Sequence, residues 1–122
     1  MIGYTTLGSN DFEKSKTFYD GVLAELGAKR GMTMDRLQFW ANDAGFPMFG
    51  VCRPYDEKTA TQGNGTMVAL SAMTHEAVDA AHAKALATGA TDEGAPGLRG
   101  DTFYGAYFRD FDGNKICVFN FG

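Results

Sequence analysis

Residues 103–122, FYGAYFRDFDGNKICVFNFG, contain two strand-like runs on either side of a short polar turn. Aromatic and β-branched residues favour strands, and the turn at 110–114 is rich in Asp, Gly and Asn, which accept the backbone angles of a tight turn. The stretch therefore predicts an antiparallel hairpin. The turn also imitates the start of a calcium-binding loop, but Phe121 stands where such a loop needs its glutamate, so a plain turn is expected.

The composition indicates one compact domain over residues 1–122. The chain has 122 residues, 44% of them hydrophobic, which is enough for a core. Its net charge of -4 and the lack of a Lys/Arg cluster argue against a nucleic-acid partner. No apolar run is long enough to cross a bilayer, and the first residues lack the features of a secretion signal, so a cytoplasmic protein is expected. Cys52 and Cys117 are expected to be free thiols.

The rest of the chain divides into two similar halves. In the first, residues 2–8 predict a strand and residues up to about Leu26 a helix, capped by Asn10 or Ser9 with Glu13 completing a capping box. In the second, residues 65–71 predict the strand, and the helix runs from a Thr74 cap to Gly89. Further strands are expected at 35–41, 46–53, 103–110 and 115–121, with short ones at 29–34 and 91–93. The glycine-rich segment 94–100 predicts a mobile loop.

Several short motifs carry a family resemblance. They are Leu7-Gly8 before Asp11, Phe18-Tyr19, Leu23 to Gly27, Gly94 to Arg99, and Tyr107 to Ile116. In their order and spacing they resemble the vicinal oxygen chelate superfamily, the group of glyoxalases, bleomycin resistance proteins and extradiol dioxygenases. The resemblance implies an α+β fold of two tandem βαβββ modules, at 1–60 and 61–122, whose curved mixed sheet forms a cup. A ferredoxin-like α+β domain is the alternative.

Side chains that point into this cup follow from the alternation along each strand. Val68 and Leu70 are expected to pack under the helices, so the residues that alternate with them, Met67, Ala69 and Ser71, are expected to point into the cup. The residues expected to bind a ligand are Tyr4, Thr6, Met48, Gly50, Cys52, Met67, Tyr107, Cys117 and Phe119. The same alternation adds Gly8, Ala69, Ser71, Phe121, one of Phe39 and Trp40, and one of Tyr104 and Tyr107. The guanidinium groups of Arg36, Arg53 and Arg109 are expected at or near its rim.

The resemblance also implies where a metal would bind. The family takes one ligand from each of four strands, typically His or Gln, then Glu or Gln, then His, then Glu. This chain has Tyr4, Gly50, Met67 and Cys117 at those places. One phenol, one thiol and one thioether are a poor set for a hard divalent ion, and glycine has no side chain. No metal cofactor is therefore expected.

Other residues that could carry chemistry have simpler interpretations. His82 lies on the apolar face of the second helix, beneath the sheet. His75 is in the first turn of that helix and is expected to face solvent or the helix edge, with no partner visible in the sequence. Cys117 has no base or cation cluster beside its strand in the sequence, so it is interpreted as a small lining residue and not as a nucleophile.

These observations favour a metal-independent protein that binds a small, partly apolar organic molecule in the cup. The alternative is a metal-dependent glyoxalase-type lyase or dioxygenase with an atypical ligand set. A third interpretation is a structural fold-mate whose cup is filled by its own aromatic side chains. Whether the chain is an enzyme stays open, and no catalytic residue is assigned. The resemblance implies a homodimer.

Overall fold

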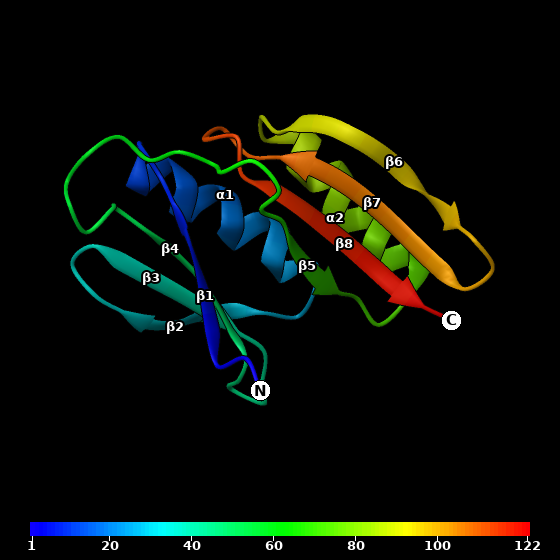
Figure 1. The fold of residues 1–122 in the computed structure, drawn as a ribbon. Coiled ribbons are helices and arrows are strands. Elements are labelled where there is room, and N and C mark those ends of the chain that lie inside the picture. Colours follow the sequence, from blue (N-terminus) through cyan, green and yellow to red (C-terminus); the bar gives the residue numbers. More distant parts are fainter.

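A computed structural model describes all residues of the chain, 1–122, as eight strands and two helices (Figure 1). The first module contains β1 (Tyr4–Gly8), α1 (Phe12–Ala24), β2 (Lys29–Thr33), β3 (Leu37–Ala41) and β4 (Met48–Cys52). The second contains β5 (Val68–Ser71), α2 (His75–Ala87), β6 (Thr91–Arg99), β7 (Phe103–Arg109) and β8 (Lys115–Phe121). The order βαβββ occurs twice, which confirms the predicted α+β fold.

The strands form two separate four-stranded sheets. Their orders are β1-β4-β3-β2, here called sheet A, and β5-β8-β7-β6, here called sheet B. In each sheet the first strand of the module runs parallel to the last, and the other pairs are antiparallel. The predicted hairpin at 103–122 is confirmed: Tyr107 pairs with Cys117, and the amide of Asp110 donates to the carbonyl of Asn114 at 3.0 Å.

The start of α1 differs from the prediction. The cap is Asp11, whose carboxylate accepts a hydrogen bond from the amide of Lys14 at 3.2 Å, and no capping box with Glu13 forms. Ser9 instead accepts from the amide of Asp11, and Asn10 makes two hydrogen bonds with Ala60 in the linker between the modules. Asn10 thus ties the helix start to a distant segment, which local spacing does not reveal. The predicted Thr74 cap of α2 is confirmed.

The segment 94–100 is not a loop over the cup. Residues 91–99 form β6, which pairs with β7 from Thr91↔Arg109 to Arg99↔Phe103. The pairing shifts register between Asp92 and Gly94 and again between Gly94 and Gly97. Glycines at such irregular places remove the apolar alternation that marks a strand, so the sequence pattern resembled a loop.

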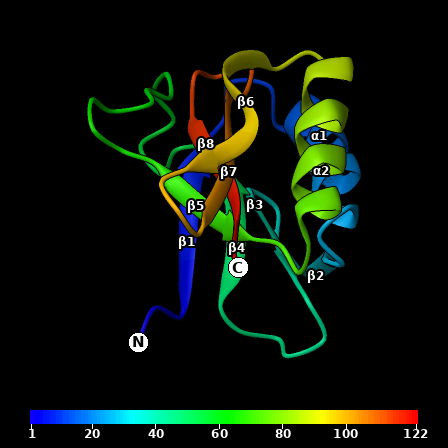
Figure 2. The same ribbon diagram turned by 90° about the vertical axis from the view of Figure 1, so that its right-hand side faces the viewer.

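Both helices lie on one side of the two sheets, and no helix covers the other side (Figure 2). The core between helices and sheets contains 17 buried residues, among them Val22, Trp40 and Val51 from the first module and Val78, Phe108 and Ile116 from the second. Val68 and Leu70 pack against this core, as the alternation predicted. Helices α1 and α2 contact one another, so the two modules are joined on their helical side. Neither helix has the length and apolar character needed to cross a membrane.

The turn of the closing hairpin also connects the modules. The buried carboxylate of Asp110 accepts a 2.6 Å hydrogen bond from the hydroxyl of Tyr19 in α1 and a 3.0 Å bond from the side chain of Asn114. Asn114 also donates to the carbonyl of Gly8 at 2.9 Å. Because these partners come from β1, α1 and the β7–β8 turn, the turn positions the second module against the first.

Candidate functional site

The predicted ligand-binding residues lie on the sheet faces opposite the helices, here called open face A and open face B. Alternation and register place Tyr4, Thr6, Met48, Gly50 and Cys52 on open face A, where β1 and β4 pair as Tyr4↔Met48, Thr6↔Gly50 and Gly8↔Cys52. Tyr4 is 59% exposed. Open face A thus presents a phenol, a hydroxyl, a thioether and a thiol, with a glycine between them.

Phe39 occupies the space above Gly50. A Cβ atom on Gly50 would lie 2.7 Å from the Phe39 ring and 3.0 Å from the carbonyl oxygen of Thr5. The Phe39 ring is itself held by an edge-on contact with Tyr4, with centroids 5.2 Å apart. Of the pair Phe39 and Trp40, it is Phe39 that lies on the open face, while Trp40 packs in the helical core. An aromatic ring therefore fills the place from which a longer side chain at position 50 would extend.

Open face B contains Tyr107, Cys117 and Phe119, and register places Ala69 and Ser71 there too. Cys117 is 1% exposed. Burial raises the pKa of its thiol, and this effect exceeds the opposing effects of the Tyr107 hydrogen bond and of two nearby cations, Arg99 and Lys115. Burial also raises the pKa of Tyr107. Both groups are therefore neutral near pH 7.

Unlike the other predicted ligand-binding residues, Met67 lies outside a strand, because β5 begins one residue after it, at Val68. Its side chain is 44% exposed and stands at the edge of open face B. Phe121 closes β8 on the same face and is 67% exposed. Tyr104 lies on the helical side, where its hydroxyl donates to Asp79.

Three residues of open face B were missed as ligand-binding candidates: Arg99, Phe103 and Lys115. Phe103 stacks on Phe119, with centroids 5.3 Å apart and the planes at 11°. Arg99 and Lys115 approach the ring of Tyr107, at 5.4 and 5.6 Å from its centroid. The alternation of 103, 105 and 107 could have identified Phe103. Arg99 could be found only once residues 91–99 were recognised as a strand.

No described cavity joins the two open faces within one chain. The sheets share no strand pairing, and none of the nine residues expected to bind a ligand lines a described cavity, whereas Ala69 and Ser71 line one beside Trp40 and Phe49. The helices join the modules on the side opposite these faces.

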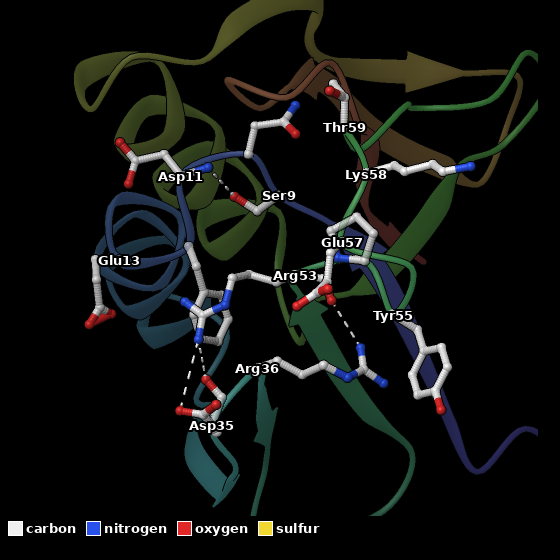
Figure 3. Close-up of a pocket in the computed structure, with 13 residues that line it drawn as sticks. Ser9, Asp11, Glu13, Asp35, Arg36, Arg53, Tyr55, Glu57, Lys58 and Thr59 are labelled. Carbon is white, nitrogen blue, oxygen red and sulfur yellow. Dashed lines mark hydrogen bonds and ion pairs between the residues drawn. The ribbon is translucent and has the colours of Figure 1, made fainter.

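The largest cavity, about 810 Å³, lies elsewhere, between the start of α1, the β2–β3 turn and the linker after β4 (Figure 3). Arg36 and Arg53, both expected near a rim, line it. Arg36 donates to the carbonyl of Arg53 and lies over the Tyr55 ring, while Arg53 donates to the carbonyl of Asp35 and lies over the Phe12 ring. The other charged lining residues are Asp11, Glu13, Glu57 and Lys58. Charges of both signs are close to balance there, so no ligand class stands out.

The remaining polar candidates have structural partners. Arg109 forms an ion pair with Glu93 at 2.8 Å. His82 is buried, as predicted, and its Nε2 lies 3.1 Å from a carboxylate oxygen of Asp92. His75 does not simply face solvent: it is half-buried, and its ring stacks on that of Tyr104 with centroids 4.0 Å apart, although its Nε2 has no hydrogen-bond partner. No group of three or more His, Cys, Asp or Glu side chains is placed to hold a metal ion. Cys52 and Cys117 are free thiols, as expected.

Two βαβββ modules with one open sheet face each define a glyoxalase-like fold. The family model for the glyoxalase/bleomycin resistance protein/dioxygenase superfamily matches residues 1–118. The chain belongs to this superfamily. Among curated proteins, no sequence is similar enough to count as a match.

Solved structures give the same result. A glyoxalase/bleomycin resistance protein from Albidiferax ferrireducens T118 is 40% identical, with a TM-score of 0.92 over 100% of this chain and 99% of that one. A glyoxalase/bleomycin resistance protein/dioxygenase family enzyme from Burkholderia phytofirmans PsJN is 21% identical, with a TM-score of 0.77 over 98% of each chain. A lactoylglutathione lyase from Agrobacterium tumefaciens is 21% identical, with a TM-score of 0.72 over 98% of this chain and 92% of that one. The last two likenesses concern the fold alone.

Proposed function

We propose that this protein binds a small, partly apolar organic molecule without a metal ion, between open face A of one copy and open face B of a second copy. The apolar part of the ligand contacts the aromatic and thioether side chains of these faces. The hydroxyls of Tyr4, Thr6 and Tyr107 orient it. Such a mixture of large apolar surface and few polar groups is typical of small-molecule sites.

The proposal that no metal ion is needed rests on the side chains at the four positions where the family binds its metal. Gly50 has no ligand atom and lies beneath Phe39, Met67 offers a thioether, and Cys117 is a buried thiol whose pKa is raised by burial. A metal would have to displace the proton of that thiol against its burial, and imidazole and carboxylate are missing from all four positions. These residues do not fit a hard divalent ion.

The dimer is proposed from the arrangement of the two sheets. The family site takes residues from β1, β4, β5 and β8, but these strands belong to two sheets whose open faces are not joined within one chain. Large apolar side chains on both faces, Tyr4, Met67 and Phe121, are 44–67% exposed. Exposed apolar groups of this kind favour association. Two copies related by a twofold axis can pair face A with face B twice, which closes both faces at once.

Elemental analysis of protein purified without chelators tests the metal-independent part. We expect far less than one zinc, manganese, iron, nickel or cobalt ion per chain, in the wild type and in the Cys117→Ala and Tyr4→Phe variants alike. The control is Tyr55→Phe, which changes an exposed phenol outside both open faces. One metal ion per chain that is retained in the control and lost in Cys117→Ala or Tyr4→Phe would overturn the proposal.

A further inference from the structure

We propose that the ligand of open face B is an organic anion, whose negative group binds Arg99 and Lys115 beside Tyr107 and whose apolar part lies on the rings of Phe103, Phe119 and Phe121. This inference rests on the proposed ligand-binding function and adds the charge of the ligand. It also adds Arg99, Lys115 and Phe103 to the binding residues.

The guanidinium of Arg99 is held in place before any ligand arrives. It donates to three carbonyl oxygens, those of Ala95, Gly97 and Gly105, at 2.7–2.8 Å. It lies over two glycines of β6: a Cβ atom on Gly94 would be 3.0 Å from its Nη2, and one on Gly97 would be 3.5 Å from its Nη1. The glycines thus leave room for this group against the strand. Three of its five N–H donors are used, which leaves two for a ligand.

The positive charge of this group has no protein counter-ion. Neither Arg99 nor Lys115 has a carboxylate within ion-pair distance, whereas Arg109 on the same sheet is paired with Glu93. Arg99 and Lys115 both lie close enough to Cys117 to favour its thiolate, but burial raises the pKa of the thiol by more. Cys117 therefore supplies no negative charge near pH 7. Although the chain as a whole carries a net charge of -4, these two cations therefore give the region around Tyr107 a local positive charge.

An aromatic platform adjoins the cations. Phe103 and Phe119 are stacked, and the ring of Phe121 meets both edge-on at 5.3 and 5.4 Å. Gly105 connects the two parts, since its carbonyl binds Arg99 at 2.7 Å and the Phe103 ring covers its Cα. An aromatic or aliphatic body on the rings can therefore place a carboxylate, sulfonate or phosphate at Arg99. Charge-assisted hydrogen bonds to such groups are the strong ones.

A matched pair of fluorescent probes tests this. Anilinonaphthalene sulfonate is an aromatic anion, and phenylnaphthylamine is the same ring system without the sulfonate. Both are titrated into the purified protein in the presence of a chelator. We expect saturable binding of both, with the anion bound about tenfold more tightly. Arg99→Gln should remove this preference while phenylnaphthylamine binds as before, Lys115→Gln should reduce it, and Arg99→Lys should keep part of it.

Arg36→Gln is the matched control. Arg36 also donates to a backbone carbonyl and lies over a tyrosine ring, but in the cavity at the start of α1. Equal affinity for the two probes, or loss of the sulfonate preference in Arg36→Gln and not in Arg99→Gln, would overturn the inference while leaving a ligand-binding function. If neither probe binds the folded wild type, the proposed function itself fails. Circular dichroism of each variant separates a lost site from a lost fold.

Discussion

Gly50 is the residue on which the proposed absence of a metal site rests most clearly. The position lies in the middle of open face A, yet the Phe39 ring and the Thr5 carbonyl leave no room for a side chain. The ring of Phe39 is in turn fixed by Tyr4. Gly50, Phe39 and Tyr4 thus pack as one unit, and a longer side chain at position 50 would require the Phe39 ring to move.

A Gly50→Ala substitution tests this packing. The new methyl group would overlap Phe39 and approach the Thr5 carbonyl, and overpacking of this kind costs about 1–3 kcal/mol. Urea unfolding should therefore show Gly50→Ala to be destabilised by that amount. Gly31→Ala, in β2, meets nothing within 4 Å and should change the free energy of unfolding far less. Equal effects of the two substitutions would contradict the described packing.

Residue-level predictions from sequence succeeded where alternation alone decides. The alternation of side chains placed Cys117 and Phe119 on one face of β8 and Ile116 and Val118 on the other, because a strand has a period of two. The cap of α1 was wrong because Ser9, Asn10 and Asp11 are all good caps, and only the contact of Asn10 with the linker shows which one is free for the helix.

At the scale of elements, the closing hairpin does more than pair two strands. Its turn contributes Asp110, which is 4% exposed and accepts a hydrogen bond from the hydroxyl of Tyr19 in α1. Burial raises the pKa of this carboxyl, although hydrogen bonds from Tyr19 and Asn114 act in the opposite direction. A carboxyl with a raised pKa stabilises the fold most below its unfolded pKa, and this contribution is lost as the pH rises through the folded-state pKa.

The substitution Tyr19→Phe should show how much the hydrogen bond between Tyr19 and Asp110 stabilises the fold. It keeps the ring but removes a donor from a buried carboxylate, so a loss of about 1–3 kcal/mol is expected near neutral pH. The pKa of Asp110 should rise further in the variant, so the loss must become smaller as the pH falls and the carboxyl takes up a proton. Urea titrations at neutral and at mildly acid pH measure both effects.

The matched control is Tyr104→Phe. The hydroxyl of Tyr104 also donates to a carboxylate at 2.6 Å, that of Asp79, but this pair is exposed to solvent. Water can replace the lost donor there, so little change is expected. A Tyr19→Phe loss that grows on acidification, or that only equals the effect of Tyr104→Phe, would show that Asp110 is not the buried acceptor described.

Element prediction failed at β6 for a physical reason. Strand signals come from branched and aromatic residues, but residues 91–99 contain glycines that pack beneath Arg99 and allow register shifts. The properties that give this strand its role on open face B are those that hide it in the sequence. Arg99 was missed for the same reason, whereas Lys115 shares a face of β8 with Cys117 and Phe119 and could have been found by alternation.

At the scale of the whole molecule, the sequence predicted both modules but not their relation. Each βαβββ unit is encoded by local periods, caps and turns. The joining of the modules depends on contacts between α1 and α2 and on the Asp110 network, which connect residues far apart in the chain. In our proposal, a second copy brings the two open faces together to form the expected cup.

Charged substitutions on either open face should weaken that dimer. Tyr4→Glu places a carboxylate on open face A, and Phe121→Glu places one on open face B. Sedimentation equilibrium should give a mass near twice 13.2 kDa for the wild type and a shift towards one chain for each variant. Met73→Glu, at a side chain 91% exposed in the loop before α2, should remain dimeric.

The most direct test of the paired-face account is the mass of an equimolar mixture of Tyr4→Glu and Phe121→Glu. If face A pairs with face B, each variant alone spoils both interfaces of its dimer, whereas the mixed dimer concentrates both changes in one interface and leaves the other intact. Pairing of face A with face B should therefore make the mixture dimerise more tightly than either variant alone. A mixture as monomeric as its components, beside a dimeric wild type, would contradict the pairing of face A with face B.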